Sequence, residues 1–378
     1  MPRTLLVTND FPPTIGGIQS YLRDFLGCLD PHDVVVFAST QDEKAAREFD
    51  AQADFQVVRW PRKVMLPTPA TIRRMQELIS EHNIDTVWFG AAAPLALMGK
   101  AAKQAGARKV VATTHGHEVG WSMLPGARQA LRMIGNSADT ITYISDYTLR
   151  RFSKAFGPHP QWVHLPSAVS VEQFGQPEAS KAEAKAHFGL VDSPTAPVIL
   201  CVSRLVPRKG QDQLLRAMPL VRQHCPDAQL LIIGRGRYRA TLKELAKIYD
   251  PSAVIQEAKD SNELSLAFQA GDIFAMPVRT RGKGLDVEGL GIVYLEAQAA
   301  SLPVIAGNSG GAPETITKET GVVINGNNVH ELADALVEML LNPQQSAAMG
   351  KAGRVHVEQN WTWEIMGERL RKALQPEN

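Results

Sequence analysis

The chain has 378 residues, more than one hydrophobic core usually supports, and its 44% apolar and 21% charged residues are typical of a globular protein, so two domains are expected. A formal net charge of +1 provides no overall field that would attract nucleic acid, which is therefore not an expected partner. The three cysteines are scattered and odd in number, which argues against a disulfide scaffold.

Short apolar runs alternate with amphipathic segments through the first part of the chain. The segments at 18–29 and 71–82 have the periodicity of helices that bury one face. Most of the apolar runs are continuous rather than alternating, which is typical of parallel strands covered on both faces. These predicted strands lie at residues 4–8, 33–39, 55–60, 85–90, 109–114 and 139–144.

A second series of runs follows a segment at 164–197 that is rich in Pro, Ser, Ala and charged residues. Its predicted strands lie at 197–203, 227–234, 272–278, 302–307 and 320–326. Two strand–helix series separated by a break predict an α/β protein with two doubly wound domains. We place the first domain at 1–168, with a C-terminal helix at 361–378 returning to it, and the second domain at 169–360.

The segment GLDVEGLGIVYLEAQA at 284–299 holds two glutamates, Glu288 and Glu296, among glycines and apolar residues. The glycines make its first half a poor helix, so we expect the helix to begin near Ile292, with Glu288 in the preceding loop. The Gly-Leu-Gly turn exposes backbone N–H groups at a positive helix end, which favours a phosphate. Carboxylates repel phosphate, so the two glutamates suit hydroxyl groups on either side of it. For this spacing alone, an acidic helix start with one exposed glutamate is the plainer interpretation.

Three other strand-to-helix junctions have features of a phosphate site. Two cations beyond a strand suit a diphosphate, and glycine pairs before a helix present bare N–H groups. Each junction alone is equally well explained by a solvated basic turn or a structural glycine turn. Their agreement favours one ligand site. The first of the three junctions has Arg204 with Lys209 after the strand at 197–203, and the second has Gly16 with Gly17 after the strand at 4–8. The third has Gly310 with Gly311 before a helix opened by Pro313, with Glu314 in its first turn.

Together these motifs resemble the retaining glycosyltransferases of family 4 over nearly the whole chain. That family has the GT-B architecture, in which two Rossmann-like domains face each other across a cleft. The segments at 279–299 and 113–121 further resemble the bacterial phosphatidylinositol mannosyltransferases. The resemblance implies transfer of mannose from GDP-mannose to the inositol 6-hydroxyl side of a phosphatidylinositol monomannoside, a phosphoinositide lipid acceptor.

The resemblance also implies roles for individual residues. Arg204 and Lys209 would neutralise the donor diphosphate and the charge that develops on the leaving group. Glu288 would bind hydroxyls of the transferred sugar, and Glu296 would bind those of the ribose. The other donor contacts implied are Gly16, Gly17, Gln256, Ala258, Lys259, Gly289, Leu290, Gly291 and Ile292.

Two of these assignments remain open. His117, in the HGHE motif, best matches a histidine near the sugar O6, but His115 lies two residues away in the same motif. The family usually has a glycine where this chain has Glu257, so the contacts to the nucleobase are also open.

The mechanism implied is retention by front-face attack, in which the leaving phosphate helps to deprotonate the acceptor hydroxyl. Neither glutamate is expected to be a nucleophile, because one of them is assigned to ribose. The sequence has no Asp-x-Asp pair of the kind that holds a divalent cation in many sugar-nucleotide enzymes. His115 and His117 could suggest zinc, but zinc needs three or four ligands and no partner cluster is visible. No metal and no cofactor are expected.

A lipid acceptor would require contact with a membrane. No window of about 18 residues could span a bilayer, and the first apolar run is too short for a signal peptide, so we expect a cytoplasmic protein peripheral at the inner face of the plasma membrane. Residues 57–76 combine cations with apolar side chains, which suits an anionic surface, and 119–124 is a second apolar loop. A surface loop followed by an ordinary amphipathic helix is the alternative. The contacts concerned are Arg59, Trp60, Arg62, Lys63, Arg73 and Arg74, with Met65 and Leu66 beside them.

Four other functions remain open. The same motifs fit a transferase that uses a UDP-sugar on a soluble acceptor, because few contacts select the base and the sugar. A sugar-nucleotide epimerase would turn over the donor without an acceptor, and a glycogen-type phosphorylase would need a pyridoxal-phosphate lysine, for which no strong candidate stands out. A non-enzymatic nucleotide-sugar sensor would need the phosphate contacts but no catalytic residues.

Overall fold

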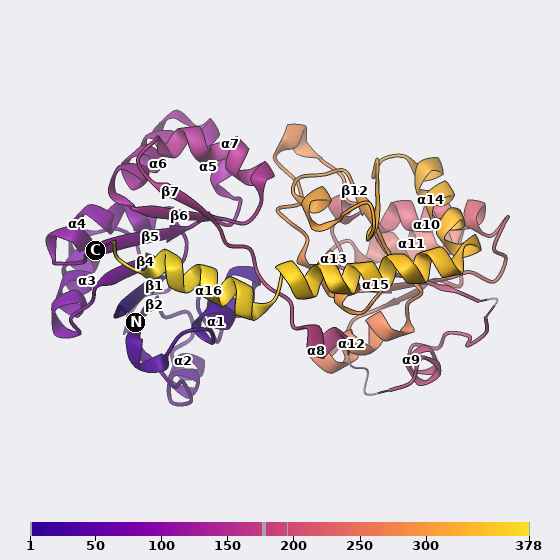
Figure 1. Cartoon of the computed structure of the whole chain (residues 1–378), viewed down its shortest axis with the longest axis horizontal. Coiled ribbons are helices and arrows are strands. Elements are labelled where there is room, and N and C mark those ends of the chain that lie inside the picture. The colour runs from indigo at the N-terminus through magenta and orange to yellow at the C-terminus, as the bar shows by residue number, and fades with distance from the viewer. Residues whose placement is uncertain (1, 176–178, 195, 378) are drawn as a thin grey trace. The chain divides into compact units, whose positions relative to one another are not determined.

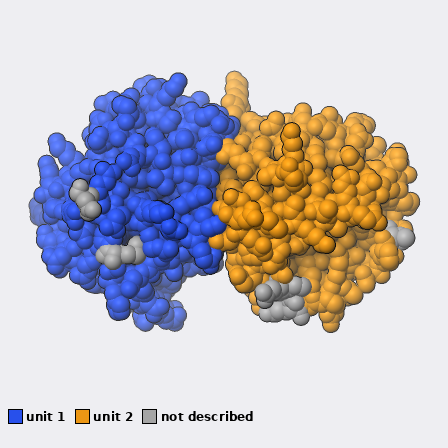
Figure 2. All heavy atoms as spheres, viewed as in Figure 1, with its two compact units in different colours: residues 1–167, 363–378 blue, residues 168–362 orange. Residues whose placement is uncertain are grey.

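The computed structural model describes residues 2–175, 179–194 and 196–377, which divide into two compact units (Figure 2). The first unit comprises residues 1–167 with 363–378, and the second comprises residues 168–362. The sequence-based boundaries are 1–168 with 361–378 for the first domain and 169–360 for the second.

The first unit is built on a parallel sheet whose described strands number seven, in the order β3-β2-β1-β4-β5-β6-β7. The strand order reverses between β1 and β4, and such a switch point is where open α/β sheets bind ligands. The strands are β1 (Thr4–Thr8), β2 (Val34–Ser39), β3 (Gln56–Trp60), β4 (Thr86–Phe89), β5 (Lys109–Thr113), β6 (Thr140–Tyr143) and β7 (Gln161–His164). The helices are α1 (Gly17–Leu26), α2 (Glu43–Asp50), α3 (Pro69–Glu81), α4 (Gly99–Gln104), α5 (Glu118–Met123), α6 (Pro125–Ser137), α7 (Asp146–Phe156) and α16 (Trp363–Leu374).

The second unit repeats this plan with a parallel sheet of six described strands in the order β10-β9-β8-β11-β12-β13. Its switch point lies between β8 and β11. The strands are β8 (Val198–Val202), β9 (Gln229–Ile233), β10 (Val254–Gln256), β11 (Ile273–Met276), β12 (Val304–Gly307) and β13 (Gly321–Ile324). The helices are α8 (Val171–Gly175), α9 (Lys181–His187), α10 (Gln211–Val221), α11 (Arg239–Tyr249), α12 (Ser261–Ala270), α13 (Ile292–Ala299), α14 (Val329–Leu341) and α15 (Pro343–Asn360).

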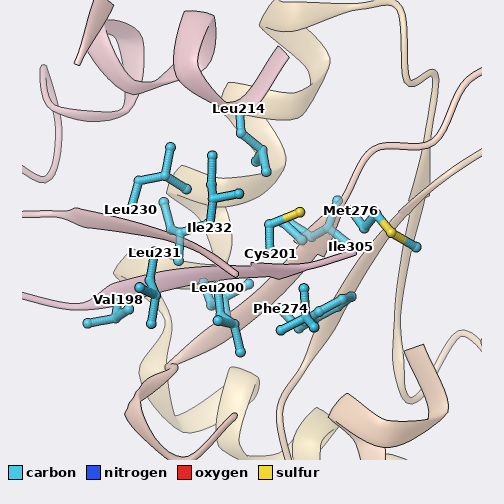
Figure 3. Packing of buried hydrophobic residues seen from close by; sticks show 14 of the residues in the cluster. Val198, Leu200, Cys201, Leu214, Leu230, Leu231, Ile232, Phe274, Met276 and Ile305 are labelled. Atoms are coloured by element: carbon cyan, nitrogen blue, oxygen red, sulfur yellow. The ribbon is translucent and has the colours of Figure 1, made fainter. Parts of the chain in front are cut away.

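The apolar runs of the sequence form the cores of both sheets. In the second unit, Leu200, Leu231 and Phe274 come from neighbouring strands and are completely buried (Figure 3). Each such side chain stabilises the fold by roughly 1.5–3 kcal/mol relative to exposure. The predicted α/β class with two doubly wound domains is confirmed. Strands β7 and β10 were not predicted as strands.

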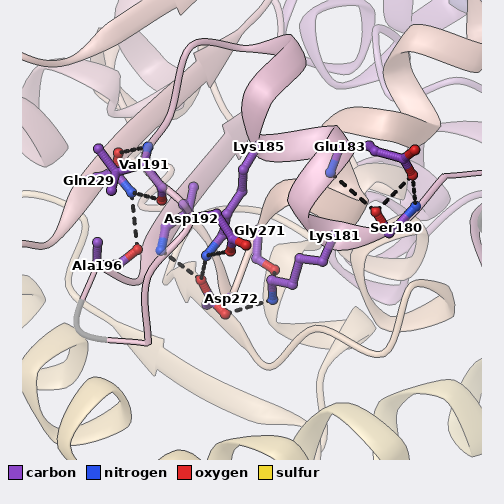
Figure 4. Close-up of polar contacts among 11 residues, drawn as sticks. Ser180, Lys181, Glu183, Lys185, Val191, Asp192, Ala196, Gln229, Gly271 and Asp272 are labelled. Carbon is purple, nitrogen blue, oxygen red and sulfur yellow. Dashed lines mark hydrogen bonds and ion pairs between the residues drawn. The ribbon is translucent and has the colours of Figure 1, made fainter.

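Ion pairs from one exposed and one buried lysine fix helix α9 to the second sheet (Figure 4). The Lys181 Nζ lies 2.6 Å from Oδ1 of Asp272, just before β11, and the Lys185 Nζ lies 3.6 Å from Oδ2 of the same carboxylate. Ser180 and Glu183 form a capping box at the start of the helix. The segment predicted as a break between the two strand series therefore contains short helices that pack on the second unit.

The C-terminal helix α16, yellow in Figure 1, packs within the first unit against α1 and β5. Its end is held by side chains of the sheet. The Thr86 hydroxyl donates to the Leu374 carbonyl oxygen at 2.8 Å, and the buried Lys109 ammonium donates to the Gln375 carbonyl oxygen at 2.8 Å. These donors satisfy carbonyl groups that the end of a helix leaves without partners. The chain thus leaves the first unit after Ser167 and returns to it at Trp363.

Candidate active site

The cations predicted from the sequence lie directly beyond the central strand β8 of the second unit. Lys209 ends a short 3₁₀ turn, Pro207–Lys209, that follows β8, whereas the Arg204 side chain is exposed. Gly210 then adopts a left-handed conformation with φ +79°, and a Cβ atom there would lie 2.1 Å from the Pro277 carbonyl oxygen. Only glycine fits this approach without strain. The turn therefore brings Lys209 next to the segment that follows β11.

A buried ion pair joins two of the predicted residues. The Lys209 Nζ lies 2.6 Å from Oε2 of Glu288, and each of these two side chains is only 9% exposed. The Arg208 Nε lies 3.8 Å from the same carboxylate oxygen. Burial would raise the pKa of Glu288, but the charges of Lys209, Arg208 and Arg204 outweigh it and hold the pKa below its ordinary value. Glu288 is therefore an ionised carboxylate that can accept hydrogen bonds from hydroxyl groups.

Arg208 is a residue that the sequence-based reasoning missed. Its guanidinium also lies 3.6 Å from a carboxylate oxygen of Asp286, two residues before Glu288. The available signal was its position in PRKG, immediately before Lys209. The structure therefore adds a third cation to the two predicted from the sequence.

The glycine turn at 310–311 packs against the backbone of Glu288. Gly310 has φ +63°, and a Cβ atom on it would lie 1.7 Å from the Glu288 carbonyl oxygen. The Gly311 N–H donates to that same oxygen at 3.0 Å. Two motifs recognised separately in the sequence thus form one structural feature. The helix expected at Pro313 is only one 3₁₀ turn, Ala312–Thr315.

Helix α13 begins at Ile292, as the sequence predicts, and its N-cap Gly291 is left-handed with φ +88° and makes no side-chain capping bond. The backbone of this turn, with buried Leu290, lies between the two glutamates. Glu296 is partly buried one turn into the helix, and burial raises its pKa to about 7 despite the opposing charge of Lys209. An uncapped helix start beside cations is a suitable site for an anion.

The raised pKa of Glu296 predicts a pH-dependent stability difference for Glu296→Gln. The folded state binds the proton more tightly than the unfolded state, so the unaltered protein loses stability as pH rises from the ordinary glutamate pKa through about 7. Glutamine cannot ionise and avoids this loss. We expect Glu296→Gln and the unaltered protein to have similar free energies of unfolding in urea at pH 5. At pH 8 we expect the variant to be more stable than the unaltered protein by on the order of 2 kcal/mol. An equal difference in stability between the two proteins at both pH values would contradict the raised pKa of Glu296.

The predicted nucleobase segment, residues 254–259, begins with β10 at one edge of the second sheet. The Gln256 carbonyl oxygen accepts from the Gly234 N–H at 2.8 Å, and the Lys259 N–H donates to a carboxylate oxygen of Glu263 at 2.6 Å. Ala258 is partly buried. Glu257, which replaces the usual glycine of the family, is exposed and lies 3.5 Å from Arg235. These contacts do not identify a base, so the roles of Gln256, Ala258 and Lys259 stay predictions.

The glycine pair of the first unit stands at the start of α1. Gly16 is the N-cap in an extended conformation without a side-chain capping bond, and Gly17 is the first helical residue. A Cβ atom on Gly16 would approach the flexible Gln19 amide at 2.3 Å, whereas one on Gly17 would meet nothing within 4 Å. The Gln19 amide donates to a carboxylate oxygen of Asp10 at 3.1 Å. The bare helix start expected from the sequence is present, and its ligand stays a prediction.

The two candidate histidines after β5 differ in environment. The His115 Nε2 lies 2.7 Å from the Gly90 carbonyl oxygen, and its ring meets Tyr21 edge-on. Burial lowers the pKa of His115 to about 4. The His117 side chain is instead 42% exposed, with its Nε2 3.3 Å from Oε1 of Glu118. His115 is thus occupied within the fold, which favours His117 as the ligand-facing residue.

The predicted membrane residues are only partly available at the surface. The prediction that Met65 is exposed is wrong, because its side chain is completely buried. Arg59 is only 14% exposed, because it forms a two-pronged ion pair with Asp50 at 2.7 and 3.0 Å and a bond to Pro12. Trp60 packs on the core of the first unit. The prediction that Arg59 and Trp60 contact the membrane is therefore wrong, because both side chains are engaged within the fold of the first unit.

The remaining residues of that segment differ in how free they are. Arg74 lies 3.0 Å from Glu77 and 2.9 Å from Glu81, so its charge is locally neutralised. Arg62, Lys63 and Arg73 are exposed. Exposed apolar side chains in the two predicted loops are Val64, Leu66, Met123 and Leu124, at 59%, 52%, 56% and 63% exposure.

The described residues lack both a cluster of metal ligands and a membrane-spanning helix. Among them, no group of three or more His, Cys, Asp or Glu side chains is placed to hold a metal ion. Within the same residues, no helix is both long enough and apolar enough to cross a membrane.

Family models match most of the chain. The model described as Glycosyltransferase Family 4 matches residues 15–173, and that described as Glycosyl transferases group 1 matches residues 183–356. A GDP-mannose-dependent monoacylated alpha-(1-6)-phosphatidylinositol monomannoside mannosyltransferase of Corynebacterium glutamicum is 60% identical, over 99% of this chain and 98% of the relative. A GDP-mannose-dependent alpha-(1-6)-phosphatidylinositol monomannoside mannosyltransferase of Mycolicibacterium smegmatis is 51% identical, over 98% and 97%.

Solved structures share the fold at low sequence identity. Anabaena Alr3699/HepE in complex with UDP has a TM-score of 0.79 and 16% identity, over 98% of this chain and 99% of that one. Sucrose-phosphate synthase from Thermosynechococcus elongatus has a TM-score of 0.76 and 20% identity, over 98% of each chain. At these identities the likeness concerns the arrangement of strands and helices alone.

Proposed function

Since the chain belongs to glycosyltransferase family 4, we propose that it transfers mannose from GDP-mannose to the inositol 6-hydroxyl side of a phosphatidylinositol monomannoside. The names of relatives that are 60% and 51% identical along their whole length support this donor and acceptor. Retention of the anomeric configuration, by front-face attack, is part of the proposal.

The observation that carries the proposal is the cluster of Glu288, Lys209 and Arg208 at the switch point of the second sheet. In it, an ionised carboxylate lies beside cations and an uncapped helix start. We assign the donor diphosphate to Arg204, Lys209 and the N–H groups before α13, and sugar hydroxyls to Glu288. Charge that develops on the leaving diphosphate would be stabilised by the same cations.

The two glutamates would then hold opposite ends of one nucleotide-sugar, with the ribose hydroxyls on Glu296. Gly289–Ile292 would line the phosphates between them. In the first unit, His117 is assigned to the transferred sugar, and Gly16 with Gly17 to the phosphates. We propose that no metal or other cofactor takes part, because the cations of the chain itself can balance a diphosphate.

Calorimetric titration with GDP and with UDP tests the donor. We expect GDP to bind at least tenfold more tightly than UDP, with the same affinity in EDTA and in magnesium. The tenfold margin corresponds to about 1.4 kcal/mol, within the contribution of base hydrogen bonds. A preference for UDP would favour the alternative of a UDP-sugar transferase with a soluble acceptor. Affinity that requires magnesium would overturn the metal-free proposal.

Turnover with and without acceptor separates the enzyme classes. We expect GDP release from GDP-mannose to depend on added phosphatidylinositol monomannoside. Conversion of the donor sugar without any acceptor would instead indicate an epimerase, and tight donor binding without turnover in either case would indicate a sensor.

We further propose that the first unit docks on an anionic membrane surface at the inner face of the membrane. Arg62 and Lys63 are exposed cations that adjoin the exposed Val64 and Leu66 in the chain, and Arg73 is exposed on the following helix, α3. Exposed cations with exposed apolar side chains suit an anionic interface.

The triple variant Arg62→Gln, Lys63→Gln, Arg73→Gln tests this docking. It should bind phosphatidylserine vesicles about 100-fold more weakly, from roughly 1 kcal/mol per cation near the surface. GDP affinity should be unchanged. The control variant Lys243→Gln, Lys318→Gln, Lys351→Gln removes the same charge from exposed lysines of the second unit and should bind vesicles normally. If both variants lost the same vesicle affinity, the loss would be due to net charge alone, and this surface would not be the docking site.

A further inference from the structure

Glu118 is a completely buried carboxylate in the first unit that the proposed reaction does not use. It is the first residue of α5, and the chain folds over it through Gly116, which has φ +94°. Its Oε2 accepts hydrogen bonds from the backbone N–H groups of His115, at 3.2 Å, and Gly116, at 3.0 Å. One oxygen of the carboxylate is therefore fixed by the backbone.

The other carboxylate oxygen faces His117. Oε1 is buried and has no hydrogen bond within the described structure, but it lies 3.3 Å from the Nε2 of His117. Leaving a buried carboxylate oxygen without a partner is costly, by about 1–3 kcal/mol or more. Burial accordingly raises the pKa of Glu118, while His117 and the backbone N–H groups lower it. The geometry thus gives this oxygen one side chain to bind, and that side chain is His117.

This contact distinguishes the two ring nitrogens of His117. Nε2 is directed at the buried carboxylate, so the other nitrogen, Nδ1, remains for a ligand on a side chain that is 42% exposed. The other titratable groups near the ring are Asp10, which acts on it electrostatically, and His115, whose ring centroid lies 6.3 Å away. His115 is already bonded to Gly90. Glu118 is therefore the group that can select which nitrogen of His117 carries the proton.

We propose that Glu118 is a positioning residue that holds the neutral His117 ring with its proton on Nε2, so that Nδ1 is a hydrogen-bond acceptor for a hydroxyl of the substrate. This step rests on the proposed function only in identifying that hydroxyl as one of the transferred sugar. The carboxylate itself contacts no substrate. It acts by fixing the orientation and the tautomer of the ring.

Glu118→Gln reverses this arrangement while preserving shape. The glutamine carbonyl oxygen can still accept from the two backbone N–H groups, which turns its NH₂ group toward His117. The His117 Nε2 must then accept, and its proton moves to Nδ1. ¹⁵N spectra of histidine-labelled protein read this tautomer directly, with the signal among the ten histidines assigned from a His117→Gln variant.

We expect the neutral ring to be the Nε2–H form in the unaltered protein and the Nδ1–H form in Glu118→Gln, with an unchanged melting temperature. The same tautomer in both proteins would overturn the proposal. This measurement needs neither donor nor acceptor, so it stands even if the proposed transferase activity is absent, which would be seen as no turnover by the unaltered protein.

Kinetics then separate positioning from a merely structural role. We expect Glu118→Gln to lower kcat for mannosyl transfer about tenfold, the equivalent of one hydrogen bond, with little change in KM for GDP-mannose. Glu118→Gln combined with His117→Ala should be no slower than His117→Ala alone, because Glu118 acts through that ring. Losses that multiply in the double variant, or an altered tautomer with unaltered kcat, would each overturn the positioning role.

Discussion

Replacing Glu288 with glutamine is expected to lower kcat for mannosyl transfer at least 100-fold and to destabilise the second unit. The neutral amide loses the charge-assisted hydrogen bonds to sugar hydroxyls that the ionised carboxylate can make. It also leaves the 9%-exposed Lys209 ammonium without its partner at 2.6 Å, and breaking a buried pair costs roughly 3–5 kcal/mol. Steady-state rates and urea unfolding measure the two effects.

The double variant Glu288→Gln, Lys209→Met separates the two effects. Removing both charges removes the penalty of an unpaired ammonium, so stability should return to near that of the unaltered protein. Activity should not return, because both the proposed hydroxyl acceptor and a proposed diphosphate contact are missing. A double variant that regains both stability and activity would show that Glu288 serves the fold alone.

Replacing Gly310 with alanine is expected to weaken GDP-mannose binding at least tenfold without removing any charged group. The new methyl group would start 1.7 Å from the Glu288 carbonyl oxygen, at a residue whose φ of +63° already disfavours alanine. The loop that carries Glu288 must therefore move, and Glu288 then no longer lies where it can bind the hydroxyls of the transferred sugar. We expect a loss of stability of about 1–3 kcal/mol as well.

Gly126→Ala is the matched control for Gly310→Ala. A Cβ atom on Gly126 would meet nothing within 4 Å, and this glycine lies in the first turn of α6 without a positive φ. Its substitution should leave donor binding unchanged and slightly stabilise the helix. Normal donor affinity in Gly310→Ala would mean that the Glu288 loop is not what positions the donor.

Much of the fold could be predicted from the sequence because its central strands are continuous apolar runs. Strands covered on both faces by helices need such runs, and this requirement is local. The edge strands β7 and β10 escaped prediction for the same reason. They have four and three residues, most of which are only partly buried, so they carry little apolar signal.

The residues of the candidate site could be predicted from the sequence, but the ion pair that two of them form could not. The motifs placed Lys209 and Glu288 at strand-to-helix junctions, and the structure joins them in one ion pair at 2.6 Å. Their contact depends on the order of strands in the sheet, which periodicity does not encode. The burial of Arg59 and Met65 was equally hidden, because residues 57–76 combine cations with apolar side chains in a way that suits an exposed surface.

The return of the chain to the first unit at Trp363 has a consequence for how the protein is made. The surface of α1 and β5 that receives α16 stays uncovered until the last helix has left the ribosome, because residues 168–362 are synthesised in between. The second unit can complete its fold while the first still lacks its final helix. Nascent chains that stop before residue 363 would expose the apolar surface against which Met366, Leu370 and Leu374 pack in the complete chain. Such an exposed apolar surface is a natural target for chaperones during synthesis.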